Sequence, residues 1–191
     1  MKFIFSRNLL RLAALACAIP LTAQTVNTPA APAAEVAFAA MNDALKLRGD
    51  LADSVSKGTL NEQAAISRLK GQGQATGLGV DPETDFAVAA MDVGRRLVVK
   101  KPGSATQFFA AAEQSLEAIV QRTSDASAKD KAQLLCQLAL IRSEYLGKAT
   151  QARKDIDQAI ALQPKDSYLQ QARRVMANSH AEQFRTEGGK P

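Results

Sequence analysis

Apolar residues recur every three or four positions along most of this chain, from Glu35 onward. That spacing places side chains on one face of an α-helix. A β-strand would instead alternate apolar and polar residues, and no such run lies between turn signals. The pattern therefore predicts an all-α protein of about seven antiparallel helices, arranged as a degenerate α-solenoid or as a helical bundle.

Turn and capping residues divide this pattern into segments. Asp81-Pro82-Glu83 is the strongest helix start, because a side-chain cap, a first-turn proline and an acidic residue follow one another. We expect one helical domain over 35–186. Its predicted parts and flanks are a flexible lead-in at 24–34, N-terminal helices at 35–70, a Gly-rich linker at 71–80, a repeat-like array at 81–186 and a flexible tail at 187–191.

The segment 147–166 reads GKATQARKDIDQAIALQPKD. Ala152, Ile156 and Ala159 share one helical face, Gly147 precedes the predicted helix and Pro164 follows its end. This segment resembles the second helix of a tetratricopeptide repeat. That family places glycine at the turn between two helices, then alanine, a bulky apolar residue, alanine and a closing proline.

The resemblance covers about 132–166 and implies a capping helix after it. Leu135, Leu138 and Ala139 fit the first helix of the repeat only if one extra residue precedes Gly147. A similar spacing of apolar residues recurs upstream around Phe109. The two segments lie further apart in the sequence than the family's repeat length of about 34 residues. The N-terminal half shows no likeness, so a repeat-like helix pair and a plain helical bundle both stay open.

The first 23 residues have the layout of a secretory signal peptide. Three basic residues precede a short apolar run, Leu12 to Ile19, and Ala23 is a small residue suited to cleavage. The run is shorter than the roughly 20 residues that span a bilayer. We therefore expect a periplasmic or secreted protein without a transmembrane span in its mature part. An uncleaved amphipathic anchor is the alternative, and lipid anchoring at Cys17 is disfavoured because the apolar run before it would be too short.

The composition of the chain limits the classes of partner molecule that we expect. The chain carries a net charge of +5, and removal of 1–23 with its three basic residues would leave about +2. Charges of both signs are mixed along the remainder, whereas a nucleic-acid binder concentrates basic residues on one face. Ala and Leu supply most of the apolar residues, and Trp is absent. We expect closely packed helices and no nucleic acid partner.

The chain offers little catalytic or metal chemistry. Without Cys17, Cys136 has no partner for an internal disulfide, and His180 is the only histidine. The glycines of 71–80 lack the preceding strand of a dinucleotide site. Glu113 and Glu117 are four apart, and we expect them on the outer face of one helix. The sequence predicts no enzyme, no catalytic residue, no cofactor and no metal.

The remaining hypotheses are two kinds of binding. A non-catalytic protein–protein interaction module would use a groove between paired helices, lined by Gln133, Gln137 and Arg142 beside Asp130. The basic pair Arg95-Arg96 would add a patch for an acidic partner.

The alternative is a helical bundle that binds a small apolar or lipid-like ligand. Its internal cavity would be lined by the phenylalanines at 86, 108 and 109.

Overall fold

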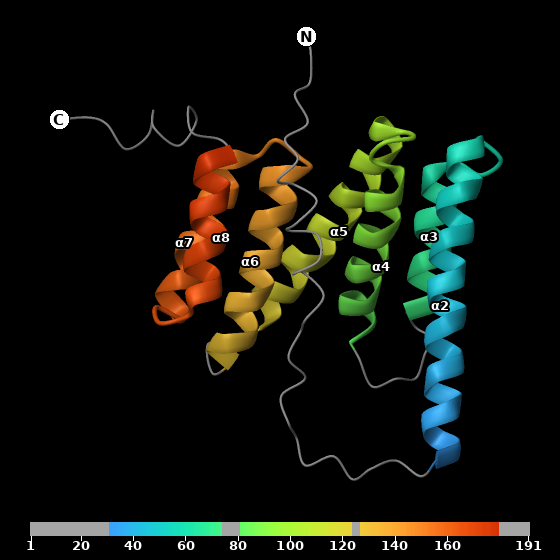
Figure 1. The fold of residues 1–191 in the computed structure, drawn as a ribbon, viewed down its shortest axis with the longest axis horizontal. Coiled ribbons are helices and arrows are strands. Elements are labelled where there is room, and N and C mark those ends of the chain that lie inside the picture. The colour runs from blue at the N-terminus through green and yellow to red at the C-terminus, as the bar shows by residue number, and fades with distance from the viewer. Residues whose placement is uncertain (1–30, 74–80, 124–126, 180–191) are drawn as a thin grey trace. The chain divides into compact units, whose positions relative to one another are not determined.

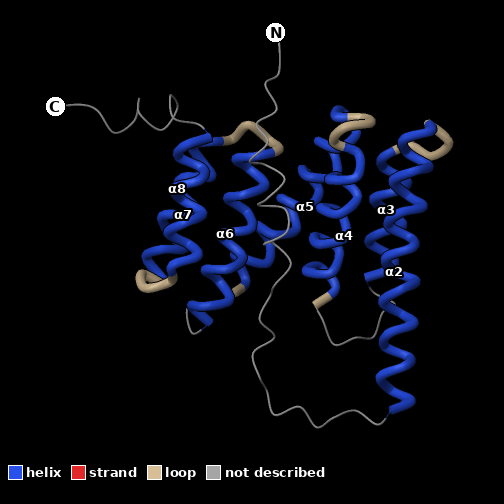
Figure 2. Tube along the Cα trace, in the orientation of Figure 1, coloured by secondary structure: helices blue, strands red, loops and turns tan. Residues whose placement is uncertain are grey.

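The computed structural model describes residues 31–73, 81–123 and 127–179 (Figure 1). Within these ranges all regular structure is helical and there is no strand (Figure 2). The seven helices are α2 (Ala31–Lys57), α3 (Glu62–Gly73), α4 (Pro82–Leu97), α5 (Pro102–Arg122), α6 (Ala128–Glu144), α7 (Ala149–Leu162) and α8 (Ser167–Ser179). They pack in adjacent antiparallel pairs, so the predicted fold class is confirmed.

The chain divides into two compact units, Met1–Phe38 and Ala39–Pro191, and the packing described below belongs to the second. Helix α2 begins at Ala31, before the expected start at residue 35, and α3 includes the first glycines of the expected linker. The predicted signal peptide, Cys17, His180 and the predicted tail lie outside the described residues.

The predicted helix start at Asp81 is confirmed. The Asp81 carboxylate accepts hydrogen bonds from the backbone N–H of Thr84 at 3.0 Å and from its hydroxyl at 2.9 Å, and Pro82 occupies the first turn. Arg122, at the end of α5, lies 2.6 Å from a carboxylate oxygen of Asp81. The start of α4 is thus fixed to the end of α5.

One hydrophobic core joins α2, α3, α4 and α5. Its largest fully buried side chains include Leu69, Leu97, Phe108, Phe109 and Leu116. Helix α6 closes this core from the other side with Leu138 and Ile141.

At the centre of this first core, α4 and α5 approach closely. The ring of Phe109 lies over Gly94, where a Cβ would be 3.0 Å from two ring carbons. On its other face the ring of Phe109 stacks against Tyr145, with ring centroids 3.9 Å apart and planes inclined by 12°. A glycine at 94 therefore gives the ring of Phe109 its place between α4 and the end of α6.

A second core joins α6, α7 and α8. Its buried residues come from all three helices: Ala132, Leu135, Cys136, Ala139, Ala152, Ile156, Ala159, Leu169, Ala172 and Met176. The three residues of the repeat-like motif are thus buried together, facing α6 and α8.

Helix α6 belongs to both cores. It packs against α5 on one side and against α7 and α8 on the other. Leu138 and Ile141 face the first core, whereas Leu135 and Ala139 face the second. Because apolar residues occur on two faces of α6, only a narrow part of its circumference remains for solvent.

Candidate functional site

The outward part of α6 carries three of the residues expected to contact a partner. Asp130 is exposed, and Gln133 and Gln137 are half-buried. Their spacings of three and four residues place them along one strip of the helix, away from Leu135, Leu138 and Ala139. We call Asp130, Gln133 and Gln137 the α6 strip. The structure brings these three residues together on one face, and their role in partner binding stays a prediction.

Arg95 and Arg96 lie elsewhere, in the last turn of α4. Arg95 is half-buried, whereas Arg96 is exposed, pairs with Asp92 at 3.2 Å and extends over Gly49 of α2. Helix α5 packs against both α4 and α6. Arg96 therefore lies on the α2 side of α4, and neither arginine is part of the α6 strip. Its proposed contact with an acidic partner stays a prediction.

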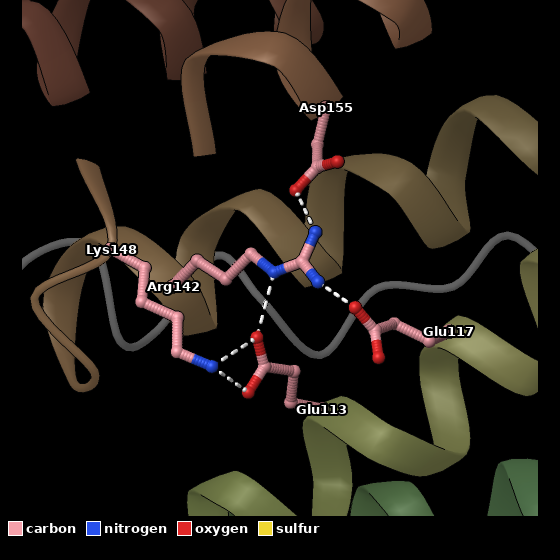
Figure 3. Close-up of polar contacts among 5 residues, drawn as sticks. All are labelled: Glu113, Glu117, Arg142, Lys148 and Asp155. Atoms are coloured by element: carbon pink, nitrogen blue, oxygen red, sulfur yellow. Dashed lines mark hydrogen bonds and ion pairs between the residues drawn. The ribbon is translucent and has the colours of Figure 1, made fainter. Parts of the chain in front are cut away.

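Arg142 lies in the interior, at the centre of a group of charged side chains (Figure 3). Its side chain is 8% exposed, and its guanidinium contacts three carboxylates. Nε donates to Glu113 at 2.8 Å, one terminal nitrogen donates to Asp155 at 2.7 Å, and the other donates to Glu117. Arg142 thus joins α5, α6 and α7. We call these residues, with Lys148, the Arg142 cluster.

Lys148 completes the cluster at the turn between α6 and α7. Its ammonium group donates to both carboxylate oxygens of Glu113, at 2.9 and 2.6 Å. Its backbone N–H donates to the carbonyl of Arg142 at 2.8 Å, next to Gly147, whose φ of 65° is a left-handed conformation. Glycine adopts that conformation without the strain of a side chain. The turn of the repeat-like motif therefore also places a cation against Glu113.

The expectation that Glu113 faces outward is wrong. Its side chain is 6% exposed, whereas that of Glu117 is 42% exposed, so the two acids differ although they are one turn apart. Glu113 lies inward because two cations from another helix and its turn neutralise it there. A sequence signal existed: Arg142 interrupts the apolar sequence of α6 beside Ile141, and a buried arginine requires carboxylate partners.

The two buried carboxylates respond to the cluster in opposite directions. Burial by itself would raise the pKa of Glu113, but hydrogen bonds from Lys148 and Arg142 outweigh it and hold that pKa below its usual value. For Asp155 burial prevails over the single contact with Arg142, and the charges of Glu117 and Glu113 add to it, so its pKa is raised. The cluster therefore contains one well-neutralised and one poorly neutralised acid.

The residues of the repeat-like motif occupy structural positions. Ala152, Ile156 and Ala159 are fully buried in the second core, and Pro164 lies in the turn after α7. Cys136 is buried in the same core, where burial and the nearby charge of Asp166 raise the pKa of its thiol to about 12. A thiol with so high a pKa remains protonated and unreactive at neutral pH.

The phenylalanines proposed to line a ligand cavity are core residues. Phe86, Phe108 and Phe109 are each buried in the first core, and the ring of Phe109 is held between Gly94 and Tyr145. In the ranges 31–73, 81–123 and 127–179, no group of three or more His, Cys, Asp or Glu side chains is placed to hold a metal ion. None of the helices in these ranges has the length and apolarity to cross a membrane.

Comparison of the chain with protein families, curated proteins and solved structures found no match.

Proposed function

We propose that the protein is exported and acts as a non-catalytic interaction module, with the α6 strip as its contact surface for a protein or peptide partner. The observation that carries this proposal is the packing of α6 between two cores. A helix held on both sides presents its remaining strip in a fixed geometry, and rigid presentation lowers the entropic cost of binding.

The resemblance to a tetratricopeptide repeat supports the same surface. It makes α6 the first helix of a pair and α7 the second, and repeat proteins bind partners along the surface that successive first helices form. Gln133 and Gln137 suit such a role, because an amide both donates and accepts hydrogen bonds and carries no charge to desolvate.

Site-specific photo-crosslinking tests this proposal. A photoreactive amino acid would replace Gln133 or Gln137 in the full chain, expressed in its exporting host. Matched control positions are the exposed glutamines Gln158 of α7 and Gln171 of α8. We expect one recurrent protein adduct from the α6 positions and none from the controls. Equal capture at all four positions, or no capture at the α6 positions, would refute the α6 strip as the binding surface.

The same preparation tests export. Mass spectrometry of the purified protein should find a mature N-terminus at Gln24, following cleavage after Ala23. A chain that retains Met1 in the exporting host would contradict this part of the proposal, independently of the crosslinking result.

A further inference from the structure

The Arg142 cluster contains one carboxylate too many. Its five residues supply two cations, Arg142 and Lys148, and three carboxylates, so the cluster carries a net charge of −1 when all are ionised (Figure 3). A net charge in a largely buried group is costly, because the surrounding protein solvates it less well than water does. One of the three acids is therefore the favoured site for a proton.

Geometry identifies that acid. Glu113 is neutralised twice, by Lys148 and by Arg142. Glu117 keeps 42% of its side chain exposed, so water still solvates its charge. Asp155 is different, because its side chain is only 12% exposed and its one cation contact in the cluster is Arg142, which it shares with the other two acids. Asp155 is thus the least stabilised carboxylate of the three.

Within the Arg142 cluster, Arg142 is the one cation that contacts Asp155. From α5 it is faced by Glu113 and Glu117, and from α6 by Arg142. Lys148 donates to both carboxylate oxygens of Glu113. Helix α8 packs against α7 through apolar residues, and its Arg173 pairs with Asp157, at 2.6 Å, instead.

We propose that the Arg142 cluster is a contact between α7 and the rest of the fold that becomes more stabilising on mild acidification. In this cluster Asp155 takes up a proton while Glu113 stays ionised. The proton comes from solvent and binds the carboxylate oxygen that does not accept from Arg142, which Figure 3 shows directed away from the guanidinium. The charge of the cluster changes from −1 to zero. The proposal does not depend on the proposed function.

The direction of the effect follows from proton linkage. The raised pKa of Asp155 means that the folded state binds this proton more tightly than the unfolded chain, in which an aspartate has a pKa of about 3.9. Lowering the pH through the folded pKa of Asp155 therefore favours the folded state. The lowered pKa of Glu113 acts in the opposite direction. Its contribution to folding stability is present above the pKa of an unfolded glutamate, about 4.3, and is lost only as pH falls through the folded pKa.

The first experiment follows the carboxyl ¹³C signals of the unmodified full chain by NMR while pH is varied. We expect the midpoint of Asp155 to lie above the ordinary aspartate value of about 3.9, and the midpoint of Glu113 to lie below the ordinary glutamate value of about 4.3. A midpoint of Asp155 at or below about 3.9 would overturn the proposal. This measurement needs no substitution, so it stands even if a variant fails to fold.

The second experiment compares substituted chains by denaturant unfolding between pH 4 and 7.5. Asp155→Asn removes the excess charge, so at pH 7.5 it should be at least as stable as the unmodified protein. On acidification the ratio of the two unfolding constants should change in favour of the unmodified protein, by up to about tenfold per pH unit. Glu113→Gln should be destabilised at pH 7.5, and because the pKa of Glu113 is lowered, that difference should persist on acidification and begin to shrink only near the unfolded pKa of about 4.3.

Asp157→Asn serves as the control. Asp157 forms partly exposed pairs with Arg173 and Arg153, so its removal should change the unfolding constant little at any pH. The proposal fails if Asp155→Asn loses stability at pH 7.5 in the way that Glu113→Gln does, because Asp155 would then be an ordinary stabilising ion-pair partner.

Discussion

At the scale of single residues, the contact between α4 and α5 depends on the absence of a side chain at residue 94. Gly94 leaves the space on α4 that the ring of Phe109 occupies, and Tyr145 covers the other face of that ring. Residues of α4, α5 and the end of α6 therefore meet at one aromatic ring. A change at Gly94 acts on all three, because interiors are packed too densely to absorb even one methyl group without movement.

We predict that Gly94→Ala destabilises the protein. Overpacking costs about 1–3 kcal/mol, and the better helix propensity of alanine returns roughly 1 kcal/mol. The net loss in the free energy of unfolding should thus reach about 2 kcal/mol, measured by urea denaturation. The control is Gly103→Ala in α5, where a Cβ meets nothing within 4 Å and stability should be unchanged or rise. Equal effects of the two substitutions would contradict the tight contact at Phe109.

At the scale of elements, the start of α4 depends on Asp81. Its carboxylate caps the helix and also pairs with Arg122 of α5. Burial by itself would raise the pKa of Asp81, but the hydrogen bonds from Thr84 and the charge of Arg122 outweigh it, so the pKa is lowered. The contribution of this group to stability is therefore present above its unfolded pKa of about 3.9 and is lost as pH falls through the folded pKa.

We predict that Asp81→Ala lowers the free energy of unfolding by about 1 kcal/mol at pH 7, the usual cost of removing a cap. Asp81→Asn should lose less, because asparagine also caps helices well. The difference between Asp81→Ala and the unmodified protein should decrease below pH ~4, as followed by thermal unfolding with circular dichroism. A difference that stays constant down to pH 2 would exclude the ionised carboxylate as its cause.

The helices themselves were predictable from sequence, because their apolar spacing and their turn residues act locally. The motif of Ala152, Ile156 and Ala159 correctly predicted one buried face. The Arg142 cluster was not predictable in the same way. Its charges come from α5, α6, α7 and the turn before α7, and the spacing within a single helix cannot show which helix lies opposite. Glu113 was misplaced for this reason, since its partners are distant in sequence.

At the scale of the compact unit from Ala39 onward, the two cores share α6. Leu116 belongs to the first core and Leu135 to the second, yet each core is closed by residues of the same helix. Loss of α6 would expose apolar surface on both sides. The two cores are therefore expected to unfold together rather than in sequence.

We predict that Leu116→Ala and Leu135→Ala each lower the free energy of unfolding by about 2–5 kcal/mol. Each substitution should also reduce hydrogen-exchange protection of the core it does not touch, for example of α4 in Leu135→Ala. Val99→Ala is the control, because Val99 is 85% exposed and its truncation should cost little. Loss of protection confined to the substituted core would show that the two cores unfold independently.

The aromatic stack between Phe109 and Tyr145 also gives the molecule an optical signal. The chain has two tyrosines and no tryptophan, so tyrosine emission is not lost by energy transfer to an indole. Tyr145 lies against the first core, whereas Tyr168 lies in the first turn of α8 and is exposed. The phenylalanine replacement Tyr168→Phe would leave Tyr145 as the single emitter, so its ultraviolet fluorescence would report the joining of α5 and α6 without any attached dye.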